Sequence, residues 1–73
     1  MRLRPLPFRE IKRKLQAAGF IVVSQKGSHV KFIKEIPGRR LIVIVPEHSL
    51  VKKGTLNGII KQAEMNLPDF EKL

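Results

Sequence analysis

The residues best suited to chemistry surround His29, one of two histidines in the chain. His29 directly follows Gly27 and Ser28, and Lys26 and Lys31 lie close to it in the sequence. An imidazole can accept or donate a proton near neutral pH, and ammonium groups neutralise phosphate. A Gly-Ser turn can present backbone N–H groups to an anion. This pattern indicates acid–base chemistry by His29 on a polyanion. The alternative is a strand histidine with no chemical role.

RNA is the polyanion that such a group of residues can cleave without a metal. The ribose 2′-OH is an internal nucleophile beside its own phosphate. The protein has to remove that proton, protonate the 5′-oxygen and stabilise charge at phosphorus. A neutral imidazole can do the first, an imidazolium or a lysine the second, and lysines or backbone N–H groups the third. One histidine is half of an acid–base pair, so the sequence leaves the second group open.

Two further lysines, Lys52 and Lys53, precede Gly54 and Thr55. Two cations beside a helix N-terminus suit phosphate oxygens, and we expect this pair to extend the RNA-binding surface. A capped helix after a solvated loop accounts for the same residues. The chain has no cysteine and its two histidines lack metal-ligand spacing, so we expect neither a metal site nor a cofactor.

The chain is strongly basic, with 15 Lys and Arg against 6 Asp and Glu and a formal net charge of +9. The excess lies in residues 1–60. Such a charge destabilises a compact chain unless a polyanion binds, so we expect a nucleic-acid partner. The aromatic residues are four Phe with no Tyr or Trp, which argues against base stacking as the main mode of recognition.

Length and hydropathy limit the architecture and the location. A chain of 73 residues forms a single domain, here residues 1–73. Its longest apolar run is far shorter than the ~20 residues that span a bilayer, and the N-terminus lacks the apolar segment of a signal peptide. We therefore expect a cytoplasmic protein that does not associate with a membrane.

The elements that hold His29 follow from the periodicity. Apolar residues at helical spacing predict a helix over 8–18 that ends at Gly19. Strands are predicted at 20–26, 29–35 and 40–45, joined by short turns at Gly27-Ser28 and Pro37-Gly38. Because 40–45 is the most apolar strand, we expect it to be central or the best covered.

A second helix is predicted from Thr55, its N-cap, to Asn66 and Pro68, with a short turn over 69–73 that folds back on the core. The order α-β-β-β-α indicates an α+β fold with a three-stranded antiparallel sheet, two helices on one face and the other face open. Double-stranded-RNA-binding domains have the same order of elements.

Several segments together resemble the HicA (YcfA-like) toxin family over nearly the whole chain. The matching segments are Gly19-Phe20, Val22-Val23, Gln25-Lys26-Gly27-Ser28-His29, Val45-Pro46 with His48, Lys53-Gly54-Thr55-Leu56, Ile59-Ile60-Lys61-Gln62-Ala63 and Pro68-Asp69-Phe70. Two features depart from the family: the turn at 35–38 is more apolar and the N-terminal segment is more basic. The second departure leaves room for additional RNA or antitoxin contacts.

The resemblance implies a toxin of a type II toxin–antitoxin system with a double-stranded-RNA-binding-like fold. Such toxins are metal-independent mRNA interferases that arrest translation, and the histidine corresponding to His29 is needed for toxicity. The implied partner is a HicB antitoxin, whose RNase H-like domain covers the active face and which often carries a DNA-binding domain. DNA would then be contacted only through the antitoxin. The alternatives are a non-catalytic double-stranded-RNA-binding domain and a degenerate toxin that retains only antitoxin binding.

Overall fold

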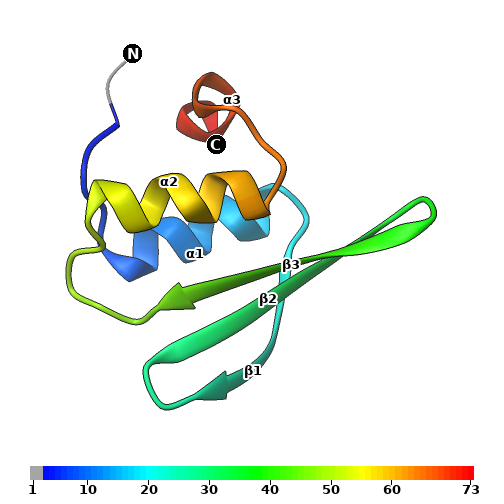
Figure 1. The fold of residues 1–73 in the computed structure, drawn as a ribbon, viewed down its shortest axis with the longest axis horizontal. Coiled ribbons are helices and arrows are strands. Elements are labelled where there is room, and N and C mark those ends of the chain that lie inside the picture. Colours follow the sequence, from blue (N-terminus) through cyan, green and yellow to red (C-terminus); the bar gives the residue numbers. More distant parts are fainter. Residues whose placement is uncertain (1–2) are drawn as a thin grey trace.

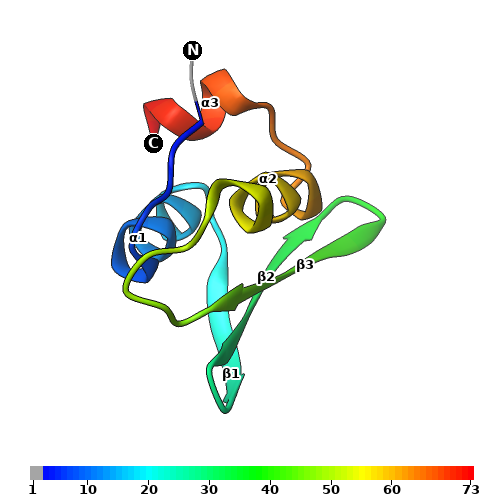
Figure 2. The same cartoon turned by 60° about the vertical axis from the view of Figure 1, so that its left-hand side comes forward.

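The computed structural model describes residues 3–73. The element order is α1 (Phe8–Ala17), β1 (Ile21–Lys26), β2 (His29–Ile36), β3 (Arg39–Pro46), α2 (Lys53–Gln62) and α3 (Leu67–Lys72). Helices α1 and α2 lie side by side on one face of the sheet, and α3 lies beyond them on the side away from the sheet (Figures 1 and 2). The predicted α+β class and the α-β-β-β-α order are confirmed, and α3 is added to them.

The sheet is antiparallel with strand order β1-β2-β3. Both connections are two-residue turns, closed by the pairs Lys26–His29 and Ile36–Arg39. Of the two alternatives for the most apolar strand, the structure shows the second: β3 is the best covered, with Leu41, Val43 and Val45 buried, but it lies at an edge because two consecutive short hairpins place β2 in the middle. Edge strand β3 is covered in part by α2, since Ile44 N donates to Gln62 Oε1 at 3.2 Å.

Helix α1 ends where the sequence predicts, because Gly19 adopts a φ of +99°. Gly19 N donates to Gln16 O and Phe20 N donates to Leu15 O, which is the paired bonding of a Schellman motif. The Phe20 side chain that follows is buried. This cap turns the chain directly from the helical layer into β1.

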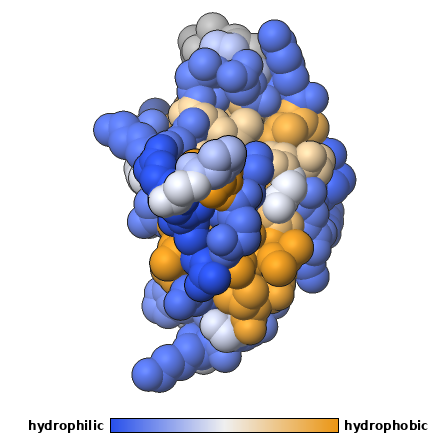
Figure 3. Space-filling model, turned by 90° about the vertical axis from the view of Figure 1, so that its right-hand side faces the viewer, coloured by the Kyte–Doolittle hydropathy of each residue, from blue (hydrophilic) through white to orange (hydrophobic). Residues whose placement is uncertain are grey.

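The core lies between the helices and one face of the sheet. From the sheet it takes the inward residues of β2 and β3, and from the helices their apolar stripes; its largest members include Phe32, Val43, Val45, Ile11, Leu15, Leu56, Ile59 and Phe70. Strand β1 extends past the helices, and each of its six residues is exposed. Figure 3 shows hydrophobic side chains open to solvent in the lower half of the molecule, at the level of the sheet.

Helix α2 begins at Lys53, two residues before the predicted N-cap Thr55, which is therefore wrong. Lys52 takes the N-cap position without a side-chain bond. The residues of this first turn are exposed, so water can satisfy their N–H groups and no side-chain cap is required.

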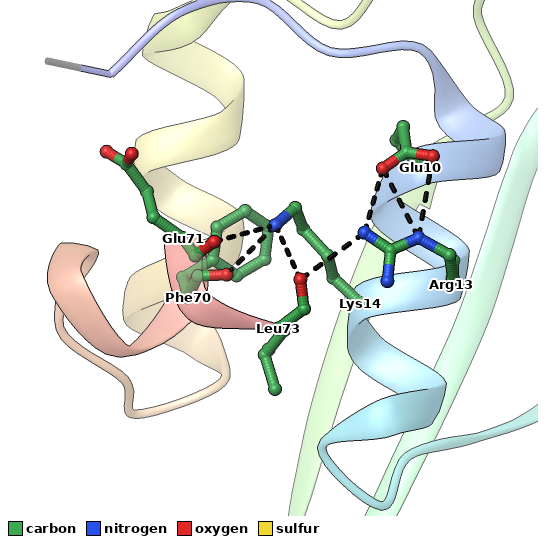
Figure 4. Close-up of polar contacts among 6 residues, drawn as sticks. All are labelled: Glu10, Arg13, Lys14, Phe70, Glu71 and Leu73. Atoms are coloured by element: carbon green, nitrogen blue, oxygen red, sulfur yellow. Dashed lines mark hydrogen bonds and ion pairs between the residues drawn. The ribbon is translucent and has the colours of Figure 1, made fainter.

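The prediction that the second helix ends at Asn66 and Pro68 is wrong, because α2 ends at Gln62 and Leu67–Lys72 form a separate helix, α3. Asn66 is its N-cap, and Asn66 Oδ1 accepts from Asp69 N at 2.8 Å. Phe70 is buried in the core, as the folding back of the tail predicts. Lys14 of α1, which is 9 % exposed, donates from Nζ to the main-chain oxygens of Phe70, Glu71 and Leu73 at 3.0–3.3 Å (Figure 4). Lys14 lies on the buried face of α1 with Ile11 and Leu15, and its ammonium group links α3 to α1.

Candidate active site

Three of the side chains predicted to act on RNA, those of Lys26, His29 and Lys31, lie together on the open face of the sheet. Lys26 of β1 pairs with His29 of β2, and Lys31 lies two residues along β2. Directly paired residues of antiparallel strands point to the same face, and so do residues two apart on one strand. Lys26 and His29 are exposed and Lys31 is half-buried. The sequence-predicted neighbours of His29 are therefore neighbours in space.

The turn between Lys26 and His29 leaves its amide groups available. Gly27 has a φ of +60° and nothing lies within 4 Å of the position a Cβ would take, so backbone conformation rather than space calls for glycine. Within residues 3–73, the N–H groups of Gly27 and Ser28 donate to no backbone acceptor. Two free N–H groups beside two lysines and an imidazole form a surface that can hold a phosphate.

The carbonyl groups of the same turn are held from the other side of the sheet. Gln25 Nε2 donates to Gly27 O at 3.1 Å and to Glu47 Oε1 at 2.8 Å. Glu47 N in turn donates to Ser28 O at 2.6 Å. Gln25 and Glu47 therefore brace the turn that carries His29.

The sequence reasoning did not identify this brace, although the sequence contains the signal for it. A two-residue turn at Pro37-Gly38 fixes the register of β2 and β3, so that His29 lies opposite Pro46. The next positions outward are Ser28 and Glu47, which are the residues that the backbone bond joins.

The charges around His29 are not neutralised by acidic side chains. The three salt bridges within residues 3–73 all use arginine: Arg13 with Glu10, Arg39 with Glu64 and Arg40 with Glu35. Neither Lys26 nor Lys31 takes part in one. The basic surface beside His29 is thus free to bind an anion.

Lys52 and Lys53 lie elsewhere, at the N-cap and the first position of α2, and both are exposed. No hydrogen bond within residues 3–73 connects them to the β1–β2 turn. They follow the loop that rises from the end of β3 to the helical layer, on the same side of the molecule as that turn (Figure 1). They form a separate basic site rather than part of the His29 cluster.

The second histidine, His48, follows Pro46, the residue paired with His29, by two positions. His48 lines a shallow depression of about 290 Å³ together with Phe8, Arg9 and Glu47. His48 O accepts from Phe8 N at the start of α1, and no hydrogen bond joins His48 to His29 in the described part of the chain. Within residues 3–73 no group of three or more His, Cys, Asp or Glu is placed to hold a metal ion, and no helix is long and apolar enough to cross a membrane.

A family model described as HicA toxin of bacterial toxin-antitoxin matches residues 8–65. The matched segment starts at the first residue of α1 and includes the whole sheet and α2, so it contains the His29 cluster. Helix α3 and residues 1–7 lie outside it. Among curated proteins, none matches the chain significantly.

Proposed function

This chain belongs to the HicA toxin family of bacterial toxin–antitoxin systems, and on that premise we propose that it is a metal-independent endoribonuclease that cleaves mRNA and so inhibits translation. The supporting observation is the placement of His29 between Lys26 and Lys31 on an open face of the sheet, beside the free N–H groups of the turn. The single toxin domain is residues 1–73, and it acts in the cytoplasm.

The roles follow from the chemistry of each group. His29 is the general acid or base, because an imidazole can both take and give a proton near neutral pH. Ser28 and the backbone of Gly27 position the phosphate. Lys26 and Lys31 neutralise it, because ammonium groups and N–H donors stabilise negative charge that develops at phosphorus.

The RNA continues from this cluster toward Lys52 and Lys53. Each phosphate that they neutralise releases counterions, so their loss weakens binding and reduces its salt dependence. The double variant Lys52→Ala/Lys53→Ala should bind RNA more weakly while its turnover at saturating RNA stays close to that of wild type.

The decisive experiment is cleavage of RNA in EDTA by the wild type and by His29→Ala. We expect the variant to lose about 10²- to 10⁴-fold in rate, the contribution of one proton-transferring group. Equal rates would exclude the role of His29, and cleavage that requires added Mg²⁺ would exclude the mechanism. Tight, salt-sensitive binding of duplex RNA with no cleavage would favour the non-catalytic alternative.

Membership in a toxin–antitoxin family implies an antitoxin partner, and the proposed partner is a HicB-type protein that covers the open face. Beside the cations, this face carries apolar side chains: Ile21, Ile42 and Ile44 are 59, 46 and 39 % exposed. Apolar side chains contribute little to phosphate binding, whereas an acidic protein with an apolar centre can cover both parts of the surface. The toxin then contacts DNA only through its antitoxin.

Co-expression with the HicB-type antitoxin tests this surface. Ile42→Asp and Ile44→Asp should abolish co-purification of the two proteins while the melting temperature of the toxin stays near that of wild type. Retention of the complex by both variants would exclude the open face as the docking surface.

A further inference from the structure

His29 is directly paired with two residues on the open face, Lys26 and Pro46, and of these only Lys26 can transfer a proton. Lys26 and His29 flank a two-residue turn and close the β1–β2 hairpin as a directly paired couple. Paired side chains of this kind have Cβ atoms about 4.5–5.5 Å apart and project from the same face. Because Gly27 and Ser28 leave no freedom in loop length, this spacing is fixed by the hairpin itself.

Cleavage of RNA by its own 2′-OH needs a base and an acid on opposite sides of the phosphorus. We propose that Lys26 is the general acid that protonates the departing 5′-oxygen while His29 removes the 2′-OH proton. This inference rests on the proposed ribonuclease function and assigns the group that one histidine leaves missing. It makes Lys26 a catalytic residue in addition to a phosphate-neutralising one.

The other candidates for the acid are less well placed. Lys31 lies on the same strand as His29 and is half-buried beside Ile44, so it flanks the imidazole along β2 and does not face it across the hairpin. Glu47 accepts a hydrogen bond from Gln25. Gln25 is paired with the buried Val30, so it lies on the helix-covered face and not on the face of His29. His48 lies beyond Glu47 in its own depression. Of these groups, only Lys26 faces His29 from the opposite strand.

The proposed step conserves atoms and protons. The 2′-oxygen bonds to phosphorus as its proton passes to the His29 imidazole. The bond between phosphorus and the 5′-oxygen breaks as Lys26 Nζ gives one proton to that oxygen. The products are a 2′,3′-cyclic phosphate and a 5′-hydroxyl, with an imidazolium and a neutral amine that then exchange protons with water.

The test compares two substrates of one sequence, chosen from a bond that the wild type is first shown to cleave. One oligonucleotide has the natural 5′-oxygen at that bond, and the other has sulfur in its place. A thiol ionises far more readily than an alcohol, so the sulfur leaves without an acid. We expect Lys26→Ala to lose at least about 100-fold in kcat on the oxygen substrate and to come within about tenfold of wild type on the sulfur substrate.

Two matched variants separate proton donation from charge. Lys26→Arg keeps the cation, but a guanidinium does not lose its proton in proteins. Lys26→Arg should therefore keep the KM of wild type and lose kcat on the oxygen substrate. Its kcat on the sulfur substrate should return toward that of wild type. Lys31→Ala removes a neighbouring cation, so its loss of kcat relative to wild type should be the same on both substrates.

An equal loss of kcat by Lys26→Ala on the two substrates, or full activity of Lys26→Arg, would overturn the role of Lys26 as general acid. Either result would leave the proposed ribonuclease function intact. Failure of the wild type to cleave any RNA would instead refute the proposed function, and this inference with it. Because Lys26 is exposed, thermal melts should be unchanged by both of its substitutions.

Discussion

The two faces of the sheet are built from alternate residues of the same strands, but one face is packed against the helices and the other is exposed to solvent. On the covered face Phe32, Val43 and Val45 are completely buried against α1 and α2. On the open face their strand neighbours Ile42 and Ile44 remain 46 and 39 % exposed. The difference teaches that apolar side chains are present in excess of what the small core can cover.

The lysines show the same contrast. Lys14, in the helical layer, is buried and its Nζ is bonded to three main-chain oxygens. Lys26, at the hairpin, is exposed and takes part in no salt bridge within residues 3–73. The helical layer therefore uses a cation to hold the fold, whereas the hairpin presents its cations to a partner.

The largest effect should come from breaking the covered face. Phe32→Ala should lower the free energy of unfolding by about 3–5 kcal/mol, because it removes a ring from a fully packed core. Ile42→Ala, on the open face, should lower it by less than about 1 kcal/mol. Urea unfolding of both variants measures the contrast, and similar losses would show that the open face is also structural.

The next effect concerns the attachment of α3. Lys14→Met should cost about 1–3 kcal/mol, because it leaves the buried oxygen of Phe70 without its donor. Hydrogen exchange of the amides of α3 should accelerate as the helix detaches. Lys12→Met, an exposed position on the same helix, is the control and should leave α3 protected. Unchanged exchange in Lys14→Met would mean that the buried Phe70 ring and the bond from Arg13 to Leu73 O are enough to hold α3.

Replacing glycine by alanine should lower the stability in the β1–β2 turn and raise it in α2. Gly27→Ala forces a side chain into positive φ and should destabilise by about 1 kcal/mol, with slower RNA cleavage because the turn positions His29. Gly58→Ala lies inside α2 with open space at its Cβ, and should stabilise by about 0.5–1 kcal/mol. Thermal melts test both signs, and stabilisation by Gly27→Ala would contradict the role of the turn.

The smallest effect is an acid dependence in α1. The hydrogen bond from Arg13 holds the pKa of Glu10 below the ordinary value of a glutamate (Figure 4). A carboxyl whose pKa is lower in the folded chain stabilises it above the unfolded pKa and loses that contribution as the pH falls through the folded one. Glu10→Gln should therefore flatten slightly the decline of the urea midpoint below about pH 4.5. An unchanged profile would show that water fully screens this exposed pair.

Much of the candidate site was predictable because its residues are adjacent in sequence. Lys26, Gly27, Ser28 and His29 form one turn, so a local rule places them together. Lys52 and Lys53 were predicted to share the RNA-binding surface, but they lie on α2, and only an experiment with RNA can connect them to the turn. Gln25 and Glu47 were missed because their contact depends on the register between strands far apart in the sequence.

Alternation and turn chemistry alone determined that three strands form an antiparallel sheet, that His29 and Lys31 share a face, and that α1 ends at Gly19. These features depend on interactions within a few residues. Only the tertiary structure decided that Lys14 Nζ donates to the main-chain oxygens of Phe70, Glu71 and Leu73, and that Gln62 Oε1 accepts from Ile44 N at the edge of the sheet. Each of these depends on which distant backbone groups need a partner once the core has closed, and local sequence carries no record of that.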